Sequence, residues 1–156
     1  DVFIPDDRVV GQPGNGWAQV ISELGYERSG PERFLSAFRV LVEYSRELSS
    51  DASDDQLSVL GRLVAHLITL RRMSISVAGM LENGETPITE AALIKDVGNA
   101  YERLVPEVVR LSRTRNPSAR FLETLNQCVL HAPSFTLRGG TREILKGVIA
   151  RGLGLR

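Results

Sequence analysis

Disulfides, metal clusters and long apolar segments are the features that this sequence has least of. Its 156 residues include one cysteine, Cys128, so no disulfide can form within the chain. His66 and His131 have no second ligand three or four residues away, which argues against a metal site. No apolar run approaches the roughly 18 residues that span a bilayer, and the start of the chain does not resemble a signal peptide. We therefore expect a cytoplasmic protein that binds neither metal nor membrane.

Charge of one sign is not in excess either, since 19 Lys and Arg balance 19 Asp and Glu. A protein that neutralises many phosphates carries a basic field, so nucleic acid is a poor candidate for a partner. The length suits one domain with its own core, because domains cluster at roughly 100 to 150 residues. The first residue is Asp1 rather than methionine, which is typical of a piece of a longer protein.

Apolar residues recur at the helical period along most of the chain. The first two apolar faces run over residues 17–24 and 34–42, and Gly30 and Pro31 predict a break between them. A polar turn is expected over Ser49 to Asp55. Further helices are expected from a cap at Ser53 or Asp54 to Asn83-Gly84, from about Thr89 to Arg115 with a bend at Pro106, over residues 121–129, and from about Thr141 to Arg151.

Three long amphipathic helices, shorter ones and brief loops bury their apolar faces best in a bundle. Val2-Phe3-Ile4 is rich in branched and aromatic residues and is closed by Pro5, which predicts a short strand. The expected fold is therefore all-α, an antiparallel up-and-down bundle of the four-helix type with a short N-terminal strand remnant. Trp17, at helical spacing, is assigned to the core.

Two separated segments are informative about function. The closing segment, Arg138-Gly139-Gly140-Thr141-Arg142-Glu143-Ile144 running on to Arg156, combines a glycine pair, a residue able to cap a helix, and an apolar-periodic helix. The opening segment contains Val2-Phe3-Ile4-Pro5, then Gly14-Asn15-Gly16-Trp17, and then Leu24-Gly25-Tyr26-Glu27-Arg28. Together they resemble the C-terminal part of the acyl-CoA dehydrogenases, in that family's order and roughly at its spacing.

The resemblance implies that residues 1–14 are the end of a β-domain and a linker, and that residues 15–156 are the C-terminal helical bundle domain. It implies an FAD-dependent oxidoreductase of fatty acid or lipid catabolism that desaturates an acyl-CoA thioester between its α and β carbons. An electron-transfer flavoprotein would accept the electrons, and the enzyme would be a homo- or hetero-oligomer, dimeric or tetrameric. The isolated chain is expected to be inactive, because in the family two other domains supply much of the FAD pocket.

The resemblance also assigns a catalytic base. In the commonest branch of the family, the base is a Glu directly before the Gly-Thr of the last helix, and that position here is Gly139. A smaller branch, which includes the isovaleryl-CoA and long-chain enzymes, takes its Glu from the first helix of the domain, directly before an Arg. Glu27-Arg28 matches this second pattern, so Glu27 is the expected base. The alternative is a solvated Glu-Arg pair on a helix turn.

The remaining site residues follow from the same match. Arg28, Gly139 and Gly140 are expected to bind the substrate, with a backbone amide of the glycine turn polarising the thioester oxygen. Thr141, Arg142 and Glu143 match positions that contact FAD, at a helix N-terminus that offers free backbone donors.

Two family segments are missing. No Arg-x-x-Phe-Gly follows the first long helix, where the chain reads Tyr44 to Ser50, and no Gln-x-x-Gly-Gly precedes the last helix. Contacts to the distal half of FAD are therefore in doubt. One alternative is a non-catalytic structural partner subunit of a heteromeric enzyme. Another is a helical interaction domain unrelated to flavoenzymes.

Overall fold

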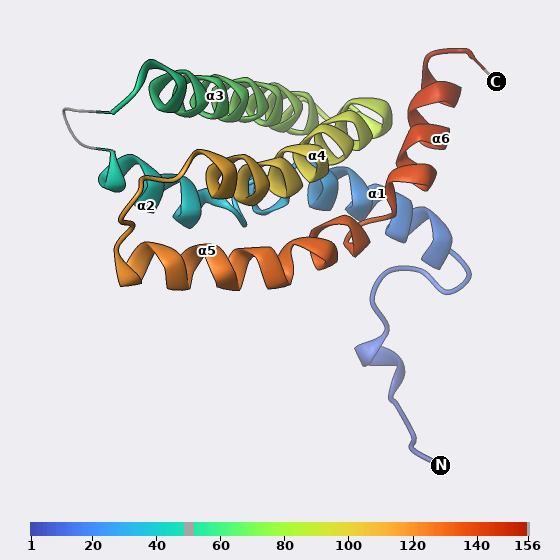
Figure 1. Ribbon diagram of the computed structural model, residues 1–156. Helices are drawn as coiled ribbons and strands as arrows, with labels where there is room; N and C mark the ends of the chain where they lie inside the picture. The colour runs from blue at the N-terminus through green and yellow to red at the C-terminus, as the bar shows by residue number, and fades with distance from the viewer. Residues whose placement is uncertain (49–51, 156) are drawn as a thin grey trace.

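The computed structural model describes residues 1–48 and 52–155, and within these residues the chain forms α-helices and short 3-10 turns but no strand (Figure 1). Residues 49–51 and Arg156 lie outside the described part, so the polar turn expected from Ser49 is only partly covered. The helices are α1 Gly16–Ser29, α2 Phe38–Glu47, α3 Asp54–Glu82, α4 Ile88–Ser112, α5 Ala119–His131 and α6 Arg142–Gly152. The 3-10 turns are η1 Asp6–Arg8, η2 Pro31–Arg33 and η3 Ala132–Leu137. The all-helical class expected from the periodicity is confirmed.

The longest helix, α3, begins and ends at residues whose chemistry favours those limits. Ser53 caps it, because the Ser53 hydroxyl accepts from the N–H of Gln56 while the Gln56 side chain accepts from the N–H of Ser53. The helix ends at Glu82 with Asn83 as its C-cap, and Gly84 follows with φ of +77°, a left-handed conformation that glycine adopts without a steric penalty. Both limits agree with those predicted from the sequence.

The centre of the molecule is α4, which packs against α1, α3 and α6 and also contacts α2, α5, η2 and η3. Its buried positions include Ala91, Ile94, Gly98, Tyr101 and Val105, spaced so that one face of the helix is enclosed. Because α4 packs against both α1 and α6, it positions the first helix relative to the last.

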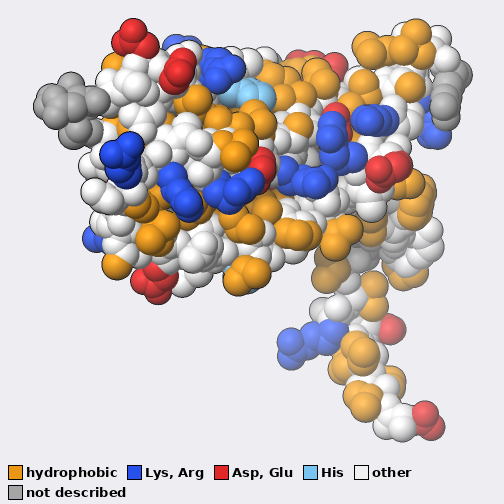
Figure 2. All heavy atoms as spheres, viewed as in Figure 1, with side chains coloured by type: hydrophobic (Ala, Val, Ile, Leu, Met, Phe, Trp, Pro, Cys, Tyr) orange, Lys and Arg blue, Asp and Glu red, His pale blue; other side chains and the backbone are white. Residues whose placement is uncertain are grey.

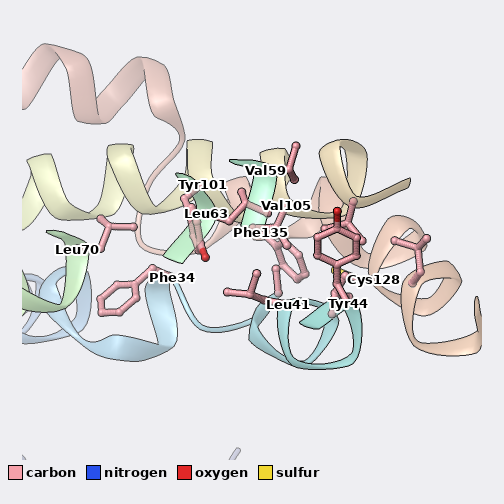
Figure 3. Packing of buried hydrophobic residues seen from close by; sticks show 14 of the residues in the cluster. Phe34, Leu41, Tyr44, Val59, Leu63, Leu70, Tyr101, Val105, Cys128 and Phe135 are labelled. Carbon is pink, nitrogen blue, oxygen red and sulfur yellow. The ribbon is translucent and has the colours of Figure 1, made fainter. Parts of the chain in front are cut away.

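A single apolar core joins α2, α3, α4 and α5 (Figure 3). We call these four helices together the helical body. Phe34, Tyr44, Leu70, Tyr101 and Phe121 are each at most 2 % exposed. The ring centroids of Tyr44 and Phe121 lie 6.4 Å apart, within the range of favourable aromatic pairs. The Tyr44 hydroxyl satisfies its hydrogen-bonding capacity with the hydroxyl of Ser112, 2.8 Å away.

The structure contradicts the expected N-terminal strand. Val2, Phe3 and Ile4 are 67 to 89 % exposed, and they form no strand because no described segment lies beside them to share backbone hydrogen bonds. Figure 2 shows this N-terminal arm carrying hydrophobic side chains away from the helical body.

The assignment of Trp17 to the core is also wrong. Trp17 is 77 % exposed and Val20 is 48 % exposed, because only the second half of α1 reaches the helical body. In α6, Leu145 is fully buried whereas the neighbouring Ile144 is 59 % exposed. Periodicity located these helices correctly but did not identify which turns have a neighbour.

Candidate active site at the glycine turn

The turn between η3 and α6 has a backbone that favours glycine at two successive positions. Gly139 has φ of +63° and Gly140 has φ of +105°, both in the region that residues with a Cβ atom rarely adopt. Thr141 then occupies the N-cap of α6 without a side-chain hydrogen bond to the backbone. The turn therefore aims the N-terminal end of α6 along a path that another sequence would follow only under strain.

Arg28 ties α1 to this turn. Its Nε donates to the Gly139 carbonyl at 2.9 Å, across 111 positions of sequence. The side chain is buried, with 7 % of the residue exposed. Burial lowers the pKa of the Arg28 guanidinium from its usual value, and the negative charge of Glu27 opposes that shift. The expected substrate-binding residues Arg28, Gly139 and Gly140 thus lie together.

Glu27 faces the same turn. A Cβ atom placed on Gly139 would lie 3.2 Å from Oε1 of Glu27. The Glu27 side chain is 34 % exposed, so it is neither enclosed in the core nor fully solvated. The carboxylate is therefore open to solvent on one side, from which a molecule could approach the turn.

Arg33, which the sequence did not single out, holds Glu27 in place. Its Nε donates to the Glu27 carbonyl at 2.8 Å, and its Nη2 donates to Oε1 of the same residue. Arg33 itself is 8 % exposed. One guanidinium thus fixes both the backbone and the carboxylate of Glu27, a two-point contact that a lysine could not reproduce.

The position of Arg33 depends in turn on a glycine of α4. A Cβ atom on Gly98 would lie 2.6 Å from the Arg33 carbonyl oxygen and 3.4 Å from Cβ of Phe34. Only glycine lets η2 approach α4 this closely. The signal in the sequence was a glycine inside an otherwise regular helical pattern, which marks close backbone approach.

Lys95 anchors the segment before the glycine turn. Although Lys95 has no exposed surface, its Nζ donates to the Phe135 carbonyl at 3.2 Å and to Oδ1 of Asn99. Burial is the largest cause, and together with the nearby positive charge of Arg138 it lowers the pKa of Lys95 to about 8. The carboxylate of Glu102 acts in the opposite direction.

Glu102 makes a second anchor to the same segment. Its Oε1 accepts from the N–H of Ser36, and its Oε2 accepts from Nη2 of Arg138, both at 2.9 Å. Glu102 has no exposed surface, whereas the Arg138 side chain is 34 % exposed. Because Arg138 directly precedes Gly139, the pair holds the start of the turn against α4.

The expected FAD-contacting residues surround the N-terminus of α6. Arg142 pairs with Asp96 through Nε and Oδ1 at 2.7 Å, so part of the hydrogen-bonding capacity of its guanidinium is already used within the chain. Glu143 is exposed, and its pKa is lowered by its own backbone N–H and then by the Thr141 hydroxyl. On the far side of Arg142 lies an open cavity of about 510 Å³, lined also by Arg103, Val129 and Pro133.

No group of three or more His, Cys, Asp and Glu side chains in the described part of the chain is arranged to hold a metal ion. No helix among the described residues is both long enough and apolar enough to cross a bilayer. No protein-family model matches the chain, and no curated protein matches its sequence.

Proposed function

We propose that this chain is the C-terminal helical domain of a flavin-dependent acyl-CoA dehydrogenase, with Glu27 as the base that removes the α proton of the thioester. The observation that supports it most is the 3.2 Å between Oε1 of Glu27 and the position of a Cβ on Gly139. We also infer that the helical body is an antiparallel up-and-down bundle of the four-helix type, with α1 and α6 closing one end.

The two positions at which the family carries its base correspond here to Gly139 and Glu27, which lie close together. A glutamate at position 139 would project its Cβ toward the place where the Glu27 carboxylate lies. A base on the last helix and a base on the first helix would therefore act on the same region of space. The glycine at 139 then leaves room for the carboxylate of Glu27.

Each residue of the site would act on the substrate or on another site residue. Oε1 of Glu27 would accept the α proton, and Arg33 would orient that carboxylate. A backbone amide of the Gly139-Gly140 turn would donate to the thioester carbonyl oxygen as negative charge develops there. Arg28, beside the turn, would add positive charge.

The cofactor would be FAD, held at the N-terminal end of α6 by Thr141, Arg142 and Glu143. A helix N-terminus presents unpaired N–H groups and a positive dipole end, which suits an electron-rich ring or a phosphate. When bound, FAD would supply the acceptor for the β hydrogen, which leaves as a hydride, and an electron-transfer flavoprotein would reoxidise it. Contacts to its distal half would come from another subunit, because the two family segments for that role are missing.

A second candidate is a non-catalytic partner subunit in a heteromeric enzyme. The ion pair with Arg33 favours it, since a carboxylate already engaged by a guanidinium is less available to a substrate proton. The two missing segments favour it as well. In that role the helices would build the oligomer while a different subunit supplies the base.

The test is Glu27→Gln in the intact protein that contains this chain. We expect FAD to remain bound and α,β-desaturation of acyl-CoA to fall by about 10²- to 10⁴-fold, the range for a lost general base. Glu23→Gln is the matched control, one turn earlier on α1 and exposed. A Glu27→Gln protein with normal turnover would remove Glu27 from the mechanism, and an intact protein that never binds FAD would favour the partner subunit.

A further inference from the structure

Two buried nitrogen atoms close to the glycine turn have no hydrogen-bond partner in the described part of the chain. They are Nδ2 of Asn99 and Nε of Arg138. Asn99 has no exposed surface. Turning its amide around would not satisfy Nδ2, because Oδ1 accepts from Lys95 and the exchange would set an N–H group against an ammonium. A buried donor without an acceptor is costly, so both atoms indicate an acceptor that the described chain does not supply.

Lys95 adds a third donor at the same place. An ammonium carries three N–H groups, and Nζ of Lys95 donates to two acceptors, Oδ1 of Asn99 and the carbonyl oxygen of Phe135. The guanidinium of Arg138 lies over the ring of the same phenylalanine, with Cζ 5.3 Å from the ring centroid. We call Lys95, Asn99 and Arg138 the donor cluster, because each of them has donor capacity left over.

The carboxylates near the donor cluster are already engaged. Oε1 of Glu102 accepts from the N–H of Ser36, and Oε2 accepts from Nη2 of Arg138. Oε1 of Glu27 accepts from Nη2 of Arg33. The spare donors therefore call for an acceptor from outside the chain.

Positive charge exceeds negative charge around Lys95. The charged groups that act on it are Arg138 before α6, Glu102 on α4, Arg33 on η2 and Glu27 on α1. With Lys95 protonated, three positive charges meet two negative ones, so one positive charge is not offset. Burial and then the charge of Arg138 lower the pKa of Lys95 to about 8. A buried water would satisfy the donors without offsetting the charge, whereas a monoanion would do both.

We propose that the donor cluster binds a small monoanion of the size of chloride, held by Nδ2 of Asn99, Nε of Arg138 and the spare N–H of Lys95. A surface cleft of about 210 Å³ between α2 and α5 reaches this region, since Ser36 and Phe135 line it. Ser36 contacts Arg138, and Phe135 contacts Lys95. Because Asn99 and Lys95 have no exposed surface, a bulky organic anion is excluded. The site does not depend on the catalytic role of Glu27.

Binding of the anion is coupled to the proton on Lys95. A negative charge beside an ammonium favours the charged form, so the pKa of Lys95 should rise by about 1 to 3 units when the site is occupied. The linkage also works in the other direction. Above pH 8 the unoccupied chain loses this proton, and the affinity for the anion should therefore fall as the pH rises.

The first experiment compares the full chain in sodium chloride and in sodium gluconate at equal ionic strength. Lys95 and Lys146 are the only lysines of the sequence, so isotopic labelling of lysine gives two side-chain signals in NMR spectra. In gluconate, the Lys95 signal should titrate near pH 8. In chloride, its midpoint should lie about 1 to 3 units higher. The exposed Lys146 is the internal control, and its signal should titrate identically in the two salts.

Thermal unfolding provides a second measurement. At pH 7, chloride at about ten times its dissociation constant should raise the melting temperature by about 3 °C relative to gluconate. Bromide should act as chloride does. Lys95→Met should abolish the difference between the salts and Asn99→Leu should reduce it, whereas Lys146→Met should retain it in full.

The proposal is overturned if the Lys95 signal titrates alike in chloride and gluconate, since water would then satisfy the donors. It is also overturned if Lys95→Met keeps the difference in melting temperature between the salts, because the anion would then act elsewhere on the chain. Should Lys95→Met fail to fold, the titration of the native chain decides the matter alone.

Discussion

Arg33 donates hydrogen bonds to both the main-chain carbonyl and the carboxylate of Glu27. The two residues lie on opposite sides of the break between helices at Gly30 and Pro31. Their contact therefore also fixes the angle between α1 and η2. In the proposed reaction, a base held at two points loses little orientational freedom when it meets its substrate.

Replacing Arg33 with alanine should reduce desaturation by the intact protein roughly 10- to 100-fold, because misplacing a catalytic group by about 1 Å costs up to that much. FAD binding should be retained. Millimolar guanidinium should restore part of the lost turnover by occupying the vacated space, which would not occur if Arg33 served only to stabilise the fold. Arg39→Ala, an exposed arginine of α2, is the control and should have native turnover. Native turnover in Arg33→Ala itself would refute the positioning role.

Adding one methyl group to Gly98 should destabilise the protein. Alanine is favoured over glycine inside a helix by up to about 1 kcal/mol, but the new Cβ would lie 2.6 Å from the Arg33 carbonyl oxygen. Overpacking of this kind costs about 1 to 3 kcal/mol, so the net change in the free energy of unfolding should be unfavourable. Urea denaturation measures it. Gly61→Ala, at an exposed position of α3 with open space around it, should instead stabilise; a gain in both variants would contradict the close contact.

The buried amine of Lys95 should make stability rise with pH just above neutrality. Its pKa is lowered to about 8 in the native state, while the unfolded chain keeps the ordinary value of 10.5. Below pH 8 both states are protonated; between pH 8 and 10.5 the native state loses a proton that the unfolded state retains, so the free energy of unfolding increases. From pH 8 to 9 the native melting temperature should rise by about 3 °C more than that of Lys95→Met.

Cys128 limits the pH range of that measurement. Burial raises the pKa of its thiol from 9 to about 11, so the unfolded state ionises first and the thiol contribution to stability falls between pH 9 and 11. This fall offsets the rise from Lys95 above pH 9, and Cys128→Ala should therefore let the free energy of unfolding keep rising beyond pH 9. A Cys128→Ala protein whose stability levels off at pH 9 like the native chain would mean that another group is responsible.

The Glu102–Arg138 pair should contribute far more to stability than the exposed Glu107–Arg110 pair on the same helix. Glu102→Gln removes a fully buried charge and weakens two hydrogen bonds, which should cost about 2 to 3 kcal/mol given that Arg138 remains partly solvated. Glu107→Gln should leave the free energy of unfolding unchanged within error. Hydrogen exchange provides a local check, because the amides of Gly139 and Gly140 should exchange faster in Glu102→Gln only. Similar losses in both variants would remove the distinction.

Helical periodicity located the elements well because it depends on local spacing. The Ser53 cap, the break at Gly30 and Pro31 and the end of α3 at Glu82 all lie within a few residues of the signals that predicted them. The prediction that Trp17 lies in the core was wrong because burial requires a neighbouring element, and spacing along one helix does not reveal whether one is present. The expected strand at residues 2–4 failed because a strand requires a second strand.

In the candidate site too, the residues that belong to local sequence motifs were predicted and the others were missed. The Glu27-Arg28 pair and the Gly139-Gly140 pair could be selected from the sequence because each is a short local motif, and the structure brings them together. Their catalytic roles remain predictions. Lys95 and Glu102 were missed because their partners are distant in sequence, as with the 40 positions between Lys95 and Phe135. Arg33 was missed although Glu27 is near in sequence, because the helix ends between them and no helical spacing predicts their contact. Only the fold reveals such contacts.

The residues of α4 that position the site lie on one face of the helix over two turns, as Lys95, Gly98, Asn99 and Glu102. Lysine and glutamate hold the segment before the glycine pair, and Gly98 admits the arginine that holds Glu27. Divergent proteins with the same arrangement should therefore share the spacing Lys-x-x-Gly-Asn-x-x-Glu followed by a Gly-Gly pair some 37 positions later. That pattern could be used to search for relatives whose overall similarity to this chain has been lost.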